Sequence, residues 1–341
     1  MDFKVTPSRL HDASIIVPGD KSISHRALML GSIAEGRTEV TGFLSGDDCL
    51  ATAAAMRTLG VTIEQPGATS LLIQGVGRDG LQAPDRDIDL GNSGTAMRLM
   101  AGLLAGQRFS CTLTGDESLT GRPMGRIITP LTLMGAAIES DCDGTPPLQL
   151  SGGLELHAID YDLPIASAQV KSAILLAGLY AEGRTSVTEP AVTRDHTERM
   201  LASMGAELTV QGGTVSIAGG KKLRGCAIEV PGDLSSATFI ILATLLSQDA
   251  DILIKNVGIN PTRTGVIDIL KGMGANLGLE NRRFLGQEPV AELRVRASQL
   301  QGGRGDAALV SLALDGFPAR FGAAAAAQGQ SRFCGLGVLR G

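Results

Sequence analysis

Apolar runs with helical spacing alternate with short strand-like runs along the chain, and the first helix follows a polar stretch. Residues 17–26 read Val-Pro-Gly-Asp-Lys-Ser-Ile-Ser-His-Arg. This order predicts the end of an extended segment, a Pro-Gly break, and a helix that starts between Asp20 and Ser22. The run Ala27-Leu28-Met29-Leu30 continues the helix as its buried face. Lys21, Arg26 and nearby hydroxyl groups therefore cluster in its first two turns.

A triplet centred on glycine recurs roughly every 70 residues, which indicates an internal repeat. Each copy follows a helical pattern and precedes a strand-like run, so its glycine fits the C-terminal cap of a helix. The copies are Leu59-Gly60-Val61, Met134-Gly135-Ala136, Met204-Gly205-Ala206 and Met273-Gly274-Ala275.

A second repeated segment lies about half a repeat away from the glycine triplets: Ala34–Thr38 resembles Ala181–Thr185. Each of these segments follows a helix of small and aliphatic residues and leads into a strand. The repeating unit is thus a helix, a strand, a second helix and further strands, in an α/β fold. The chain holds four such units and the start of a fifth near Leu312.

A third repeated sequence predicts the domain boundaries, because Val17-Pro18-Gly19-Asp20 occurs again as Val230-Pro231-Gly232-Asp233. We expect three units to form one domain over residues 18–230. Residues 1–17 and 231–341 would form a second domain, with a strand contributed by the N-terminal segment. Two chain crossings would join the domains, which favours closure onto a ligand.

Composition and charge argue against nucleic acid, a membrane or a metal ion as a binding partner. The chain has 341 residues with a net charge of −5, so no overall basic field recruits nucleic acid. No apolar run is long enough for a membrane span, and no signal peptide is evident, so we expect a cytoplasmic protein. The five cysteines lie far apart and form no metal-ligand pattern, which favours reduced structural thiols and no metal site.

The first helix of each unit begins with small or hydroxyl residues, where backbone N–H groups are free. If these helices run parallel, their positive ends converge, and a multiply charged anion could bind there despite the acidic composition. The alternative is a set of ordinary capped helices with solvated charges. The starts are Lys21-Ser22, Asn92-Ser93-Gly94-Thr95, Ser167-Ala168-Gln169 and Ser235-Ser236.

Two glycine-rich loops add candidate anion contacts. Gly94, in residues 90–98, would let a ligand approach the backbone closely, unless it is only a packing glycine. Arg122, in residues 115–126, could grip a carboxylate or phosphate with two nitrogens, unless it pairs with a neighbouring acidic residue. His196 is expected to be exposed rather than catalytic, because no nucleophile accompanies it.

Five segments resemble those of the 5-enolpyruvylshikimate-3-phosphate synthase family. They read PGDKSISHRAL, LGNSGTAMR, GDESLTGRPMGR, SAQVKSA and TRDHTERM, and the similarity runs in order from residue 1 to about 325. The resemblance implies the enolpyruvyl transferase fold, which has two domains of βαβαββ units. It also implies carboxyvinyl transfer from phosphoenolpyruvate to the 5-hydroxyl of shikimate 3-phosphate. That is a step of the shikimate pathway, which leads to chorismate and aromatic amino acids.

The resemblance also assigns roles to residues. Lys21 would contact both substrates, and Asp315 would take the proton from the attacking hydroxyl. It implies no cofactor, no metal, and a monomer that binds only small molecules. The residues implied for shikimate 3-phosphate are Lys21, Ser22, Arg26, Ser167, Ala168, Gln169, Arg194 and Asp315. Those implied for phosphoenolpyruvate are Lys21, Gly94, Arg122 and Gln169.

The C-terminal part departs from the family pattern. Gly316 stands where the family has an acidic residue after Asp315, and the family's next motif does not follow before Gly341. We therefore expect a C-terminally shortened member with an incomplete second domain, tighter binding of shikimate 3-phosphate than of phosphoenolpyruvate, and impaired turnover. Two alternatives stay open: a non-catalytic ligand-binding remnant, and the related UDP-N-acetylglucosamine carboxyvinyltransferase, against which the Lys-Ser-x-x-x-Arg pattern at residues 21–26 argues.

Overall fold

The computed structural model describes residues 4, 6, 10–303 and 317–332. The chain divides into a larger unit, Asp20–Val230, and a smaller unit formed by Met1–Gly19 and Pro231–Gly341. Each unit has its own apolar core.

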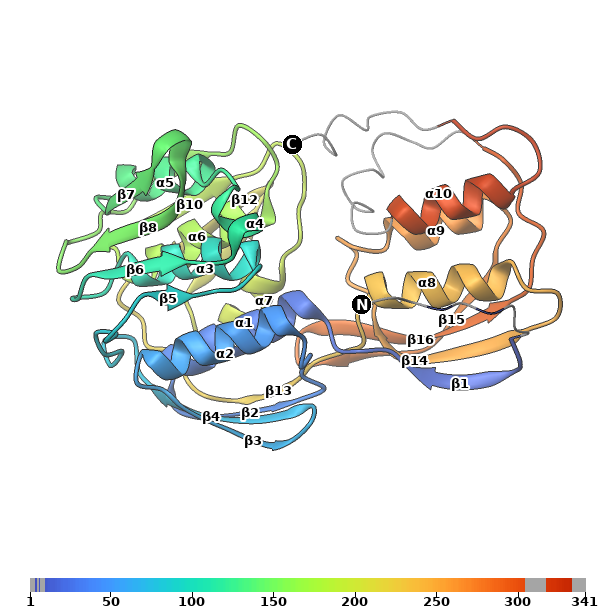
Figure 1. Cartoon of the computed structure of the whole chain (residues 1–341), viewed down its shortest axis with the longest axis horizontal. Helices are drawn as coiled ribbons and strands as arrows, with labels where there is room; N and C mark the ends of the chain where they lie inside the picture. The colour runs from blue at the N-terminus through green and yellow to red at the C-terminus, as the bar shows by residue number, and fades with distance from the viewer. Residues whose placement is uncertain (1–3, 5, 7–9, 304–316, 333–341) are drawn as a thin grey trace. The chain divides into compact units, whose positions relative to one another are not determined.

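The larger unit contains three four-stranded sheets of the same topology (Figure 1). In each sheet the first strand pairs in parallel with the second. The second strand pairs antiparallel with the third, and the third pairs antiparallel with the fourth. The sheet orders are β13(Ala227–Glu229)-β2(Glu35–Thr41)-β4(Ser70–Val76)-β3(Thr62–Gly67), β5(Ile88–Asp89)-β6(Cys111–Thr114)-β8(Thr145–Ser151)-β7(Ala137–Asp141), and β9(Asp160–Asp162)-β10(Arg184–Thr188)-β12(Thr214–Ala218)-β11(Leu208–Gln211).

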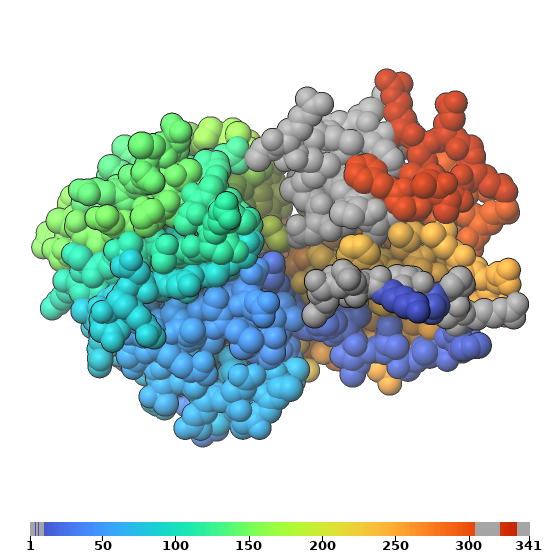
Figure 2. Space-filling view, viewed as in Figure 1, coloured from blue at the N-terminus to red at the C-terminus, as the bar shows by residue number. Residues whose placement is uncertain are grey.

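One principal helix of each repeat lies inside the larger unit, whereas the remaining helices are partly exposed. The principal helix of each repeat is almost entirely buried, and each is dominated by Ala, Leu, Ile and Met. Figure 2 shows the three repeats as one continuous body, running from blue through green. The helices are α1(Lys21–Ile33), α2(Asp47–Thr58), α3(Gly94–Leu104), α4(Glu117–Thr120), α5(Gly125–Leu133), α6(Ala168–Gly178) and α7(His196–Ser203), with a 3₁₀ turn at Cys142–Gly144.

The smaller unit repeats the same pattern once within its described residues. Its sheet has the order β1(Ala13–Ile16)-β14(Asp251–Gly258)-β16(Glu288–Arg296)-β15(Asn276–Leu285), with β1 parallel to β14. The N-terminal segment thus supplies the expected strand. Helix α8(Leu234–Leu245) packs on β14 and β16, and α10(Phe317–Ala326) packs on α8 and α9(Gly265–Gly272) (Figure 1).

The predicted βαβαββ fold is confirmed, and so is the conformation of its marker glycine. Gly60, Gly135, Gly205 and Gly274 all follow the helices of their units with φ between +87° and +100°. A side chain is strained in this left-handed region, so glycine ends the helix there at little cost. The start of the fifth predicted unit, at Leu312, lies outside the described residues, and α10 follows it in sequence.

Candidate functional site

The polar stretch at residues 20–26 forms the first two turns of α1. The Asp20 carboxylate caps the helix by accepting a hydrogen bond from the Ile23 N–H at 2.9 Å. Lys21 Nζ lies 3.0 Å from Asp48 Oδ2, and half of the lysine side chain is exposed. Ser22 is half-buried beside it. The start of α1 therefore presents an ammonium group and a hydroxyl group at the surface of the larger unit.

Arg26 is buried and joins α1 to two other helices. Its Nε donates to Thr197 Oγ1 on α7 at 2.6 Å, and its Nη2 donates to Ser172 Oγ on α6 at 2.8 Å. Its Nη1 donates to the Ser22 carbonyl at 2.9 Å, and only 4% of the residue is exposed. Arg26 thus fixes the positions of α1, α6 and α7 relative to one another.

His25 connects α1 with α2 and α3 from the other side. The Thr52 hydroxyl donates to the Asp48 carbonyl at 3.2 Å, so it accepts from His25 Nδ1 at 2.8 Å. This assigns the ring proton to Nδ1 and leaves Nε2 facing the Ser93 hydroxyl at 3.5 Å. Desolvation by burial lowers the pKa of His25 to about 3, and the nearby charges of Arg26 and Lys21 lower it further, whereas the carboxylates of Asp48 and Asp20 oppose the shift. The imidazole is neutral at ordinary pH.

The start of α3 meets the start of α6 through Gln169. Its Oε1 accepts from Arg98 Nη1 at 2.8 Å, and its Nε2 donates to Thr95 Oγ1 at 2.9 Å. A Cβ atom on Gly94 would lie 3.0 Å from both Arg98 Nη1 and Arg122 Nη1. The glycine thus leaves its backbone open where two guanidinium groups approach it.

Arg122 is oriented by an amide rather than by an acidic neighbour. Its Nη2 donates to Asn92 Oδ1 at 2.5 Å and to Ser118 Oγ at 3.2 Å. Asn92 Nδ2 in turn donates to Asp116 Oδ2 at 2.7 Å. Within the described residues Arg122 forms no direct ion pair with Asp116 or Glu117, so Asn92 stands where the alternative interpretation placed a carboxylate.

The first two turns of α1, α3 and α6 therefore form a closed triangle. His25 and Ser93 link α1 to α3, Arg98 and Gln169 link α3 to α6, and the Arg26 contact with Ser172 links α6 to α1. Burial lowers the pKa of Arg98, and the nearby Arg122 and Arg126 lower it further, because like charges oppose protonation. Three helix N-termini and several cations thus meet in one part of the larger unit, which suits an anionic ligand.

The other predicted site residues are distributed as follows. Ser167 caps α6 by accepting from the Val170 N–H at 3.4 Å, and Ala168 can offer its backbone N–H. Arg194 is half-buried in the segment before α7. Asp315 lies outside the described residues. The expectation that His196 is exposed was wrong: it is 2% exposed, because the first turn of α7 packs inward.

Sequence reasoning missed the residues whose partners are distant in sequence. Arg98 stood inside a quoted motif, yet nothing local indicated that it would orient Gln169. The contacts of His25 with Thr52 and Ser93 were missed for the same reason. Only their polarity within apolar helices could have marked them as residues that need a partner.

The described residues contain no group of His, Cys, Asp and Glu side chains arranged to hold a metal ion. In that same part of the chain, no helix is both long and apolar enough to span a membrane. Cys49, Cys111, Cys142 and Cys226 are free thiols.

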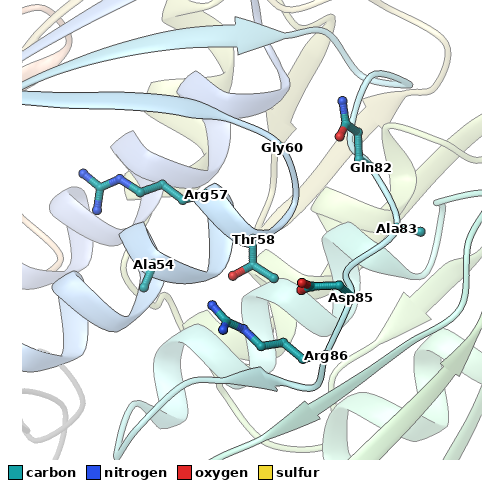
Figure 3. A pocket seen from close by; sticks show the side chains of 8 residues that line it. All are labelled: Ala54, Arg57, Thr58, Gly60, Gln82, Ala83, Asp85 and Arg86. Atoms are coloured by element: carbon teal, nitrogen blue, oxygen red, sulfur yellow. The ribbon is translucent and has the colours of Figure 1, made fainter.

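Two hollows of the larger unit lie away from the triangle. One, of about 520 Å³, lies between the end of α2 and residues 82–86 (Figure 3). There Asp85 reaches toward Thr58, while Arg57 Nη2 donates to the Ile63 carbonyl at 2.9 Å. The other, of about 540 Å³, lies beside Tyr180 and Arg108. Neither contains a predicted site residue.

Comparison with known proteins points to one family. Residues 5–341 match the model of EPSP synthase (3-phosphoshikimate 1-carboxyvinyltransferase). The chain is 56% identical over 340 residues to the 3-phosphoshikimate 1-carboxyvinyltransferase of Alkalilimnicola ehrlichii, covering all of this chain and 76% of that one. It is 55% identical over 345 residues to the protein of the same name from Hydrogenovibrio crunogenus, covering all of this chain and 78% of that one.

Comparison with solved structures points to the same family. An EPSP synthase structure from Acinetobacter baumannii superposes with a TM-score of 0.90 at 52% identity, covering 98% of this chain and 76% of that chain. The enolpyruvyl transferase NikO from Streptomyces tendae shares the fold, with a TM-score of 0.73 at 17% identity over 95% of this chain and 75% of that chain.

Proposed function

The chain belongs to the EPSP synthase family, and we propose that it transfers the carboxyvinyl group of phosphoenolpyruvate to the 5-hydroxyl of shikimate 3-phosphate, releasing phosphate. The observation that carries the proposal is the triangle of helix starts in a chain of this family. Both substrates are phosphorylated carboxylates, and the triangle gathers free backbone N–H groups with lysine and arginine side chains.

In this proposal shikimate 3-phosphate binds at the starts of α1 and α6. Lys21 and Ser22 are supported as contacts by their partial exposure at the start of α1. Ser167, Ala168 and Gln169 offer a hydroxyl, a backbone N–H and an amide at the start of α6. Arg26 and Arg194 complete the set, and the buried contacts of Arg26 suit it to holding the site together as well.

Phosphoenolpyruvate would bind beside α3. Gly94 is supported by the close approach of the Arg98 and Arg122 guanidinium groups to its backbone, each 3.0 Å from where a Cβ atom would lie. Arg122 could pair with a carboxylate or phosphate through two nitrogens, and Asn92 already orients it. Gln169 and Lys21 would reach both substrates from the neighbouring helices.

The reaction joins the substrates in two steps. The 5-hydroxyl oxygen attacks the C2 atom of phosphoenolpyruvate and gives its proton to Asp315, while the methylene carbon takes up a second proton, supplied by solvent. The resulting tetrahedral intermediate then expels phosphate and loses a proton from the new methyl group, which restores the double bond. We propose that the reaction needs no cofactor and that the protein is a cytoplasmic monomer.

The first test measures binding by calorimetric titration of the purified 341-residue chain with shikimate 3-phosphate. Removing one charge-assisted contact through Lys21→Met should raise Kd about tenfold or more. Lys222→Met is the matched control, because that lysine is 74% exposed and pairs with Glu35 elsewhere on the larger unit. Equal affinity of wild type and Lys21→Met would contradict the proposed site.

The second test follows phosphate release with both substrates present. Release that requires shikimate 3-phosphate, and that UDP-N-acetylglucosamine cannot support, would establish the proposed acceptor. Binding of shikimate 3-phosphate without any phosphate release would instead identify a ligand-binding protein. A single light-scattering measurement of mass checks the monomer.

A further inference from the structure

One buried group of charges in the larger unit takes no part in the proposed chemistry. Lys171 Nζ lies 2.7 Å from Glu189 Oε2 and 2.6 Å from Glu198 Oε1. The three side chains are 1%, 6% and 5% exposed, so all of them have lost their water. Burial of charge is costly, and such a cluster is not in itself a source of stability. Its retention inside an aliphatic core therefore calls for another explanation.

The two glutamates bracket one connection of the chain. Glu189 comes directly after β10, and Glu198 is in the first turn of α7. The residues between them include Thr193, whose hydroxyl donates to Glu189, and Arg194. A single ammonium group therefore holds both ends of the 189–198 connection against α6. We call Lys171, Glu189 and Glu198 the buried clasp.

The clasp adjoins the contacts of Arg26. Ser172 follows Lys171 on α6, and Thr197 precedes Glu198 on α7. The hydroxyls of Ser172 and Thr197 lie 2.7 Å apart, and both accept from the Arg26 guanidinium. Any shift of α7 away from α6 would break these hydrogen bonds. It would also displace the connection that carries Arg194.

We propose that Lys171 is a positioning residue that fixes the 189–198 connection, so that Arg194 and Arg26 are held ready for shikimate 3-phosphate. This inference rests on the proposed function. Lys171 itself is too deeply buried to touch a substrate. It acts by drawing Glu189 and Glu198 to one point on α6.

A purely structural role of Lys171 predicts a different result from a positioning role, so an experiment can distinguish the two roles. Buried ion pairs can often be replaced by hydrophobic residues of similar volume without loss of stability, whereas removal of one partner leaves a costly unpaired charge. The triple variant Lys171→Met/Glu189→Gln/Glu198→Gln removes all three charges and avoids an unpaired one. If Lys171 only stabilises the fold, restoring stability in this way should restore binding as well.

The experiment compares Lys171→Met, the triple variant and wild type by thermal unfolding, titration with shikimate 3-phosphate and limited trypsin digestion. Lys171→Met should lower Tm. Both variants should raise Kd by about tenfold or more, as expected from the loss of a charge-assisted contact. Both should also be cut faster after Arg194 and Arg199, as shown by the masses of the fragments. Lys221→Met, which removes an exposed pairing with Glu207, is the matched control and should change none of these.

The outcomes decide the matter. Wild-type affinity and an unchanged digestion pattern in the triple variant would overturn the proposal, whatever happens to Tm. If Lys171→Met does not fold, the triple variant alone gives the answer. If wild type does not bind shikimate 3-phosphate, the proposed function fails, while faster cleavage after Arg194 and Arg199 still supports the clasp and unchanged cleavage still overturns it.

Discussion

The two copies of Val-Pro-Gly-Asp begin helices in the two units with the same local chemistry and different surroundings. Asp20 Oδ1 accepts from the Ile23 N–H at 2.9 Å, and Asp233 Oδ1 accepts from the Ser235 N–H at 2.8 Å. Both aspartates are N-caps with extended backbone. The repeated tetrapeptide is therefore a signal for a helix start, and it carries no information about a ligand.

The starts of α1 and α8 differ in the charged residues that surround them. At α8, Arg263 Nη2 donates to Asp233 at 3.1 Å and to the Ser235 hydroxyl at 2.7 Å. An internal guanidinium thus occupies this helix start. At α1 the helix continues with Lys21, which lies half exposed. A helix start attracts an external anion through its free N–H groups. At α1 the half-exposed Lys21, which also pairs with Asp48, adds a cation there, whereas at α8 the guanidinium is bound by the capping groups themselves.

The two helices also differ in how much they bury. Helix α1 buries 11 of its 13 residues, including Ser24, His25, Arg26 and Ser32, and α8 buries 6 of 12. On α8, Phe239 is 55% exposed. Polar side chains inside a helix bundle need partners on every side. The larger unit supplies them from neighbouring helices of the repeat, and this allows a polar network to form there.

The largest expected effect comes from breaking the internal guanidinium contact of the smaller unit. Asp233→Ala leaves Arg263 without this carboxylate while the arginine side chain is 7% exposed. Loss of one partner of a buried pair should lower the free energy of unfolding by about 3–5 kcal/mol. Asp20→Ala removes the N-cap of α1 and should cost about 1 kcal/mol.

Hydrogen exchange read by mass spectrometry distinguishes these two variants by location. Asp233→Ala should speed exchange in peptides from α8, and Asp20→Ala should affect only the first turn of α1. Equal effects in the two helices would show that the Arg263 contact contributes nothing beyond capping.

The difference in burial leads to a second prediction. Leu175, on α6, is fully buried, so Leu175→Ala should cost about 2–5 kcal/mol through lost transfer energy and a cavity. Phe239→Ala on α8 removes a larger side chain but should change stability by less than about 0.5 kcal/mol, because most of that side chain already faces solvent. Urea unfolding of both variants measures the two values, and a larger loss for Phe239→Ala would show that α8 is covered in solution.

These contrasts show how far the sequence leads. The repeat, its marker glycines and the helix starts follow from local rules, and Gly205 or Ser93 could be placed from neighbouring residues alone. The family resemblance supplied candidate residues. The triangle could not be predicted, because Gln169 meets Arg98 and Arg26 meets Thr197 only through long-range packing. For the same reason His196 was wrongly expected to be exposed: its environment is set by α7 packing inward.

Protonation of His25 gives a third, smaller effect. The pKa of His25 is about 3 in the folded chain and near 6.5 when unfolded, so the unfolded state binds the extra proton first as pH falls. Stability is then lost between these two values, at up to about 1.4 kcal/mol per pH unit. From pH 7.5 to pH 5 the contribution of His25 should fall by about 2 kcal/mol.

His25→Asn provides the comparison, since an amide can face Thr52 and Ser93 without titrating. The stability gap between wild type and this variant, measured by urea unfolding at each pH, should move by about 2 kcal/mol in favour of the variant at pH 5. A constant gap would mean that His25 can be protonated within the fold. No such change is expected from α8, whose own sequence contains no histidine.

The smallest effect tests whether the two units obey the same local rule. Gly205 in the larger unit has φ +92°, and Gly274 in the smaller unit has φ +89°, with no atom within 3.4 Å of an added Cβ at either position. Alanine there should cost about 1 kcal/mol in each unit through backbone strain, partly offset by reduced freedom of the unfolded chain. Gly272→Ala is the matched control, because that glycine ends α9 without a left-handed φ, and alanine should stabilise it by about 0.5 kcal/mol or more. Unequal losses at Gly205 and Gly274 would mean that surrounding packing, rather than the turn itself, sets the cost of ending these helices.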